Sequence, residues 1–292
     1  MMSGDTRQIE DKPIEIGVRK KLQKRWFFIA VSILIVCGWL ITKSPFIKDV
    51  IGEESNVKLD DYKTEVGLTT ENSFGKLTLN EVIIEDNQLV FNATFVPADS
   101  IDFDYEIFFF PQVHVNGQDY TVRNREQTIV RDGSKHTISN TIIVSEFPQD
   151  EILTLDISYN KWNWEKSIDD PWEFQVEASQ KHLLADKKIH TVNEIITLTN
   201  GNEVKVTKVV STPISTTIYY QLVKGATESL SFKINSATGK AWRWNSFFLV
   251  DNEVGTLLLN RFDALDLTEG TYYIVPIGAD DRPLGPSIQL GK

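Results

Sequence analysis

The chain has 292 residues, more than one typical domain needs and suited to two. Hydrophobic residues make up 41% and charged residues 24%, so most of the chain is expected to fold. The formal net charge of −11 argues against nucleic-acid binding, because affinity for phosphate depends largely on Lys and Arg. The single cysteine, Cys37, excludes an intrachain disulfide and a cysteine-based zinc site.

The charge is unevenly distributed along the chain. Residues 1–25 carry seven bases and four acids, whereas residues 26–42 carry no charge at all. Those 17 apolar residues would form a helix about 25 Å long, at the short end of what spans a bilayer core. Trp26 and Trp39 lie near its two ends, where amphipathic rings prefer the membrane interface. The pattern predicts a transmembrane helix over 26–42.

The flanking charges predict the orientation of this helix. Seven bases precede residue 26, whereas only Lys43 and Lys48 follow just after the span. The more basic flank is expected on the cytoplasmic side, so the N-terminus is expected in the cytoplasm. The predicted location is the cell membrane, with a single pass and an extracytoplasmic C-terminal region. The absence of cysteine after residue 43 suits a Gram-positive surface. A cleaved signal peptide and a lipid anchor on Cys37 are the alternatives to an uncleaved signal anchor.

The predicted cytoplasmic stub, residues 1–25, contains an apolar stripe. Ile14, Val18 and Leu22 recur every four residues, which would place them on one face of a helix. Such a stripe can dock in a groove on a cytoplasmic partner. The alternative is a basic stem that lies on anionic lipid.

The first extracytoplasmic stretch changes from a polar stalk, predicted over 43–72, to an alternating pattern. Residues 76–84 and 88–95 alternate apolar and polar side chains around a polar turn, which predicts a β-hairpin. Five further strands are predicted at 107–115, 120–123, 136–144, 152–159 and 172–176. Asn116-Gly117 and Asp132-Gly133 suit tight turns. Residues 73–178 are therefore predicted to form an antiparallel β-sandwich.

A linker is predicted at 179–189, and the alternating pattern then restarts. Residues 193–199 and 203–210 form a second predicted hairpin around Asn200-Gly201. Strands are predicted to follow at 216–222, 230–234, 246–250, 256–260, 272–277 and 287–290. The predicted fold class is thus mainly β, with a transmembrane helix followed by two antiparallel immunoglobulin-like β-sandwiches, the second over 190–292.

No motif of catalytic chemistry is present. The histidines do not fall at metal-ligand spacings, and there is no Gly-x-Ser-x-Gly elbow, P-loop or Gly-x-Gly-x-x-Gly. We therefore predict a non-enzyme with no catalytic residue, cofactor or metal ligand; an ectoenzyme whose catalytic residues are scattered along the chain is the alternative. Acidic residues gather at 99–104, 169–170 and 280–281 and are interpreted as solvated loops, with a Ca²⁺ site as the alternative.

Two tryptophan pairs are candidate binding residues. Trp162 and Trp164 are predicted to share one face of a strand, as are Trp242 and Trp244. Exposed aromatic pairs can stack on sugars or anchor a protein partner. Packing in a core or over a sheet edge is the alternative for each pair.

Several strand patterns resemble one family of bacterial, mostly Gram-positive, membrane proteins. That family has an ectodomain of unknown function and is often described as negative effectors, or anti-sigma factors, of extracytoplasmic-function sigma factors. The resemblance would cover about 26–292. It is carried by Val66-Gly67-Leu68, Gly75–Ile84, Gln88–Phe95 and Trp172–Val176, and by Glu203–Tyr219, which resembles a second ectodomain module.

The resemblance implies an envelope-sensing regulator with a sigma factor or other cytoplasmic protein as partner and an envelope ligand outside. The chain departs from zinc-type anti-sigma factors, because residues 1–25 lack their His-x-x-x-Cys-x-x-Cys motif. A segment so short could hold a sigma factor only as a docked helix. A cell-surface binding or structural module with a passive anchor is the alternative function.

Overall fold

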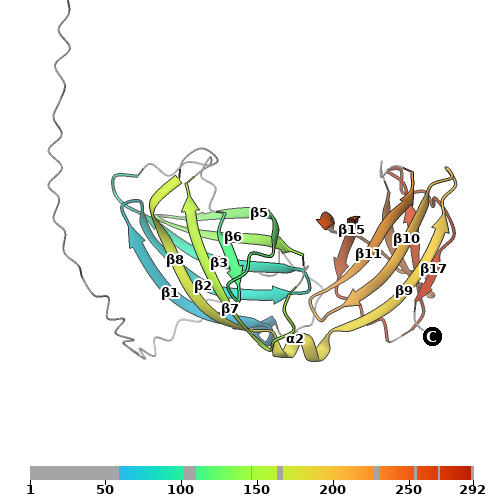
Figure 1. Ribbon diagram of the computed structural model, residues 1–292, viewed down its shortest axis with the longest axis horizontal. Coiled ribbons are helices and arrows are strands. Elements are labelled where there is room, and N and C mark those ends of the chain that lie inside the picture. The colour runs from blue at the N-terminus through green and yellow to red at the C-terminus, as the bar shows by residue number, and fades with distance from the viewer. Residues whose placement is uncertain are drawn as a thin grey trace, which may run out of the picture. The chain divides into compact units, whose positions relative to one another are not determined.

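The computed structural model describes residues 59–101, 110–145, 147–162, 167–225, 230–252, 255–268 and 270–290. Within these residues the protein is mainly β, with four antiparallel sheets and one short α-helix, α2 (Lys181–Asp186) (Figure 1). This confirms the predicted β class. The predicted transmembrane segment and stub lie outside the described residues. In the part that is described, no helix is both long and apolar enough to cross a membrane.

The strands before α2 form two sheets, which we call the first module. One sheet has the order β1-β2-β3-β6-β5 and the other the order β4-β7-β8, and all neighbours are antiparallel. The strands are β1 (Lys63–Asn72), β2 (Gly75–Glu85), β3 (Gln88–Pro97), β4 (Gln112–Val115), β5 (Thr121–Asp132), β6 (Lys135–Val144), β7 (Ile152–Lys161) and β8 (Ser167–Ser179).

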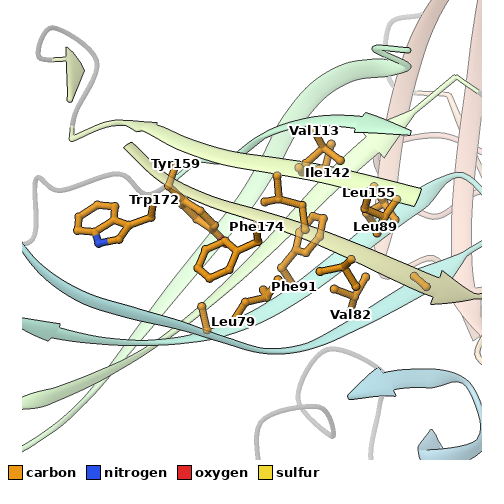
Figure 2. Packing of buried hydrophobic residues seen from close by; sticks show 14 of the residues in the cluster. Leu79, Val82, Leu89, Phe91, Val113, Ile142, Leu155, Tyr159, Trp172 and Phe174 are labelled. Atoms are coloured by element: carbon orange, nitrogen blue, oxygen red, sulfur yellow. The ribbon is translucent and has the colours of Figure 1, made fainter. Parts of the chain in front are cut away.

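The two sheets of the first module enclose one hydrophobic core. Alternate residues of each strand point inward, so the core takes side chains from both sheets. Its largest members include Trp172, Tyr159 and Phe91, all less than 2% exposed. Figure 2 shows these rings among aliphatic side chains such as Leu79 and Leu155. The Trp172 Nε1–H donates to the Gly75 carbonyl oxygen at 3.0 Å, which satisfies the buried indole.

The predicted stalk extends too far toward the C-terminus. A short 3-10 turn, η1 (Leu59–Asp61), is followed by β1, which pairs with β2 over its whole length. β1 is polar because it is an edge strand in which half of the residues are exposed and none is buried. Its composition therefore resembles that of a stalk.

The strands after α2 form a second pair of sheets, the second module. The sheet orders are β14-β15-β11-β10-β9 and β13-β12-β16-β17. The strands are β9 (Lys188–Thr197), β10 (Glu203–Ser211), β11 (Ser215–Lys224), β12 (Ser231–Ser236), β13 (Ala241–Arg243), β14 (Ser246–Asn252), β15 (Gly255–Asp263), β16 (Tyr272–Ile277) and β17 (Ile288–Leu290).

A second core fills the space between these sheets. Tyr220 and Phe232 are fully buried there and meet edge to face, with ring centroids 4.8 Å apart. The predicted linker, 179–189, contains α2 and the first residues of β9 rather than extended chain. Leu183 of α2 is buried, so this connection is packed against the protein.

Candidate functional site

The turn that joins β2 to β3 is buried, although a hairpin turn is normally exposed. Its four residues, Glu85 to Gln88, are each 8% exposed or less. Asp86 adopts the left-handed region with φ 39°, which turn residues such as Asp tolerate. The side chains of this turn bind residues of the second module. We call this contact the junction.

Glu85 is the most deeply buried charge of the junction, with no exposed surface. Its Oε1 accepts hydrogen bonds from the Ser215 hydroxyl at 2.6 Å and from the Thr212 hydroxyl at 3.2 Å. Its Oε2 accepts a charge-assisted hydrogen bond from the guanidinium of Arg261. The carboxylate of the first module is thus held by three side chains of the second.

Asp86 forms a second set of contacts. One carboxylate oxygen lies 2.8 Å from the Lys187 Nζ, and the other accepts a hydrogen bond from the Tyr219 hydroxyl. Burial, followed by the negative charge of Asp86, raises the pKa of Tyr219 well above its usual value. The phenol therefore stays protonated and remains a donor to Asp86.

Arg261 connects the polar and apolar parts of the junction. Besides Glu85, its guanidinium donates to the Asn87 side-chain oxygen. The same group lies over the Phe248 ring, 5.4 Å from the centroid, which is cation–π geometry. Arg261 and Lys187 balance the charges of Glu85 and Asp86.

Apolar side chains surround this polar cluster. Ile143 of the first module packs with Val210, Phe248 and Leu259 of the second, and all four are fully buried. In β10 and β15, the residues that precede Val210 and Leu259 point to the other face, into the core of the second module. The outward face of this sheet is therefore a covered surface.

The energetics of the junction depend on each buried charge keeping its partner. A buried ion pair offsets a large desolvation cost only when further hydrogen bonds satisfy the two charges. Glu85 has such bonds from Ser215 and Thr212. Removal of one partner from a buried pair typically costs about 3–5 kcal/mol. The junction can therefore fix one contact geometry between the modules.

Several predicted binding residues lie outside the described residues. These are the stripe residues Ile14, Val18 and Leu22, and also Trp164. Trp162 lies one residue beyond the end of β7 and is 8% exposed. Its ring packs against Phe74, with centroids 4.7 Å apart, and belongs to the first core. For Trp162 this geometry favours packing over a binding role.

The second tryptophan pair is more accessible. Trp242 is half-buried on β13, with Lys240 Nζ 4.9 Å from its ring centroid and Tyr272 5.9 Å away. Trp244 follows β13 and is 40% exposed, and the nearby Phe247 is 37% exposed. Trp244 is thus the candidate of this pair that can reach a partner.

The acidic loops have different surroundings. Asp281 accepts a hydrogen bond from Arg243 at 2.8 Å and lies 4.0 Å from Lys233, so cations already neutralise it. Asp169 and Asp170 lie on β8 and are exposed. Over the described ranges, no group of three or more His, Cys, Asp or Glu side chains is arranged to hold a metal ion.

The junction was not among the predicted sites, although part of its signal is in the sequence. Residues 248–250 and 257–259 are unbroken apolar runs rather than alternating ones. A strand with apolar side chains on both faces is buried on both faces. The signal for the polar residues is weaker, because Glu85, Asp86 and Asn87 form a typical exposed turn sequence.

Comparisons with known proteins give a likeness of fold. No protein-family profile matches the chain, and no curated protein matches it. A solved structure described as the conserved domain protein from Bacillus anthracis is similar, with a TM-score of 0.57 and 16% identity. The similarity covers 75% of this chain and 78% of that one. At this identity the likeness concerns the fold alone.

Proposed function

We propose that the protein is a single-pass membrane protein whose β-rich region lies outside the cytoplasm and acts in envelope sensing or regulation of the anti-sigma-factor type. The uncharged segment 26–42 and the bases before it support the membrane topology. The stripe of Ile14, Val18 and Leu22 provides the cytoplasmic contact.

Each module is proposed to be immunoglobulin-like. In the first module, β2-β3-β6-β5 opposite β4-β7-β8 matches the ABED and CFG sheets of a constant-type domain. In the second, β10-β11-β15-β14 opposite β12-β16-β17 has the same order, with β13 beside β12. One strand precedes the matching set in each case, β1 in the first module and β9 in the second.

The junction is the observation that carries the sensing proposal. Glu85 and Arg261 join the modules through a buried ion pair. A displacement of the second module, caused by a ligand or by a force, is then transmitted to the first module rather than absorbed by a hinge. The first module leads through β1 to the membrane segment.

The test is recovery of an extracytoplasmic-function sigma factor with the full chain in mild detergent. Wild type is expected to retain the sigma factor, and replacement of Ile14, Val18 and Leu22 by Ser is expected to release it. Ile9→Ser, off the stripe, is the matched control and should behave as wild type. If wild type retains no sigma factor, the regulatory proposal fails.

Topology has its own test. Protease added to intact cells is expected to digest the region after residue 43 and to spare an epitope placed at the N-terminus. A β-rich region that resists protease in intact cells but not in lysed cells would refute the orientation.

A second function is favoured by the exposed aromatic surface. Trp244 at 40% exposure and Phe247 at 37% could anchor an envelope ligand to a passively anchored surface module. This function predicts that Trp244→Ala reduces retention of the full chain on isolated cell envelopes without a change in melting temperature. Unchanged retention would argue against it.

A further inference from the structure

Three buried polar atoms at the junction have no hydrogen-bond partner among the described residues. They are the Arg261 Nε, the Asn87 Nδ2 and the Thr217 Oγ1. The residues are 4%, 4% and 0% exposed, so bulk solvent does not satisfy these atoms. Buried polar groups in folded proteins are nearly always paired, because an unpaired group loses its hydrogen bonds to water without replacement.

The three residues are neighbours. Thr217 on β11 lies directly opposite Arg261 on β15, and directly opposite residues of an antiparallel pair point to the same face. The guanidinium of Arg261 also donates to the Asn87 side-chain oxygen. The unpartnered atoms therefore gather around one side chain, at the covered face of the second module.

Their chemistry selects the ligand. Arg Nε–H and the Asn amide N–H are donors, and a Thr hydroxyl can also donate. A Thr hydroxyl can also accept, so the bound group must accept hydrogen bonds from the two N–H groups and either accept from or donate to Thr217 Oγ1. A water molecule would accept from the two N–H groups and donate to the Thr hydroxyl, whereas a chloride ion would accept from all three. Three bonds are what an internal water molecule typically makes.

We propose that the junction binds one small hydrogen-bond acceptor, a water molecule or a chloride ion, through Arg261 Nε, Asn87 Nδ2 and Thr217 Oγ1. Water is the expected occupant, because the charges of Glu85 and Asp86 already balance those of Arg261 and Lys187. This site is independent of the proposed sensing function. It makes the contact between the modules hydrated rather than dry.

Thr217→Val in the full chain tests the site, because a bound acceptor and an unpaired hydroxyl predict changes in stability of opposite sign. Val keeps the shape and suits a strand but cannot bond the bound acceptor. The substitution is expected to lower the ratio of folded to unfolded protein about five- to thirtyfold, as loss of 1–2 kcal/mol does. If the hydroxyl were truly unpaired, its removal would leave stability unchanged or raise it, and that result would overturn the proposal.

Controls separate the hydroxyl from other effects. Thr70→Val makes the same substitution on the edge strand β1 and, because Thr70 is only half-buried, is expected to change stability less than Thr217→Val. Thr217→Ser keeps the hydroxyl and should be more stable than Thr217→Val. If both Thr217 variants lose stability equally, the hydroxyl is not responsible and the site is refuted.

Chloride replacement distinguishes the two occupants. Unfolding of wild type is measured in sodium chloride and in sodium gluconate at equal ionic strength, so that screening is the same. Equal midpoints assign the site to water. A higher midpoint in chloride that disappears in Thr217→Val assigns it to chloride.

Discussion

Replacement of Arg261 by Met would expose how much the junction depends on its ion pair. Glu85 has no exposed surface, so its carboxylate could not recover solvent when the guanidinium is removed. The hydroxyls of Ser215 and Thr212 would remain as neutral donors. They cannot neutralise the charge, and a buried charge without its partner is strongly destabilising.

The expected cost of Arg261→Met is about 3–5 kcal/mol, the usual effect of removing one partner of a buried pair. This is a large part of the roughly 5–15 kcal/mol by which folded proteins are stable. In a domain of this size class, a loss of 1 kcal/mol lowers Tm by about 2–4 °C. The variant should therefore melt roughly 6–20 °C below wild type.

Urea unfolding of the full chain, followed by tryptophan fluorescence, would measure this cost in a double-mutant cycle. Glu85→Gln alone should be destabilising, and Glu85→Gln with Arg261→Met should lose less than the sum of the single variants. Arg243→Met is the matched control, because its 2.8 Å pair with Asp281 is exposed and should contribute about 0–1 kcal/mol. Additive effects, or an Arg261→Met cost as small as that of the control, would refute a buried, coupled pair.

Three further substitutions test the first module and its pH response. Trp172→Ala should lower the free energy of unfolding by about 3–5 kcal/mol and abolish much of the near-UV circular dichroism, because the indole is fully buried. Trp244→Ala, at an exposed position, should change stability by about 0.5 kcal/mol or less. Equal losses would contradict this difference in burial. Gly75→Ala should lower the free energy of unfolding, measured in urea, by more than about 1 kcal/mol. The backbone φ is 145° and the new Cβ would lie 2.3 Å from the Val96 carbonyl oxygen. An unfolding midpoint equal to that of wild type would show that the strands relax freely. Burial, and then the charge of Arg131, lower the pKa of His136. Because the unfolded chain then binds more protons than the folded chain, the contribution of His136 to the free energy of unfolding should be fully present above about pH 6.5 and should be lost as the pH falls below it. His136→Gln should therefore lose less stability than wild type between about pH 7.5 and pH 5.5. An identical loss would exclude His136 as the source.

The alternating strands were predictable because one face of each meets a core and the other meets solvent. The predicted hairpin at 76–84 and 88–95 is found as β2 (Gly75–Glu85) and β3 (Gln88–Pro97). Asn116 and Gly117 both have positive φ, at 50° and 78°, as the tight-turn prediction requires. The polar edge strand β1 was missed, because pairing on one side leaves few buried side chains to mark it.

The junction could not be predicted by the same means. Its polar contacts join residues separated by more than 100 positions, such as Glu85 and Arg261. Local propensity carries no information about such pairs, and acidic residues in a turn normally face water. The apolar runs at 248–250 and 257–259 do indicate a doubly buried sheet. They do not indicate that a hairpin turn provides the cover.

The covered face of the second module constrains how the chain can change over evolutionary time. If residues 188–290 were transferred alone into another protein, Val210, Phe248 and Leu259 would meet water and Arg261 would lack its carboxylate. A contiguous exposed apolar surface of that kind promotes aggregation. Gene fusion or domain shuffling is therefore expected to move the two modules together, as one heritable unit.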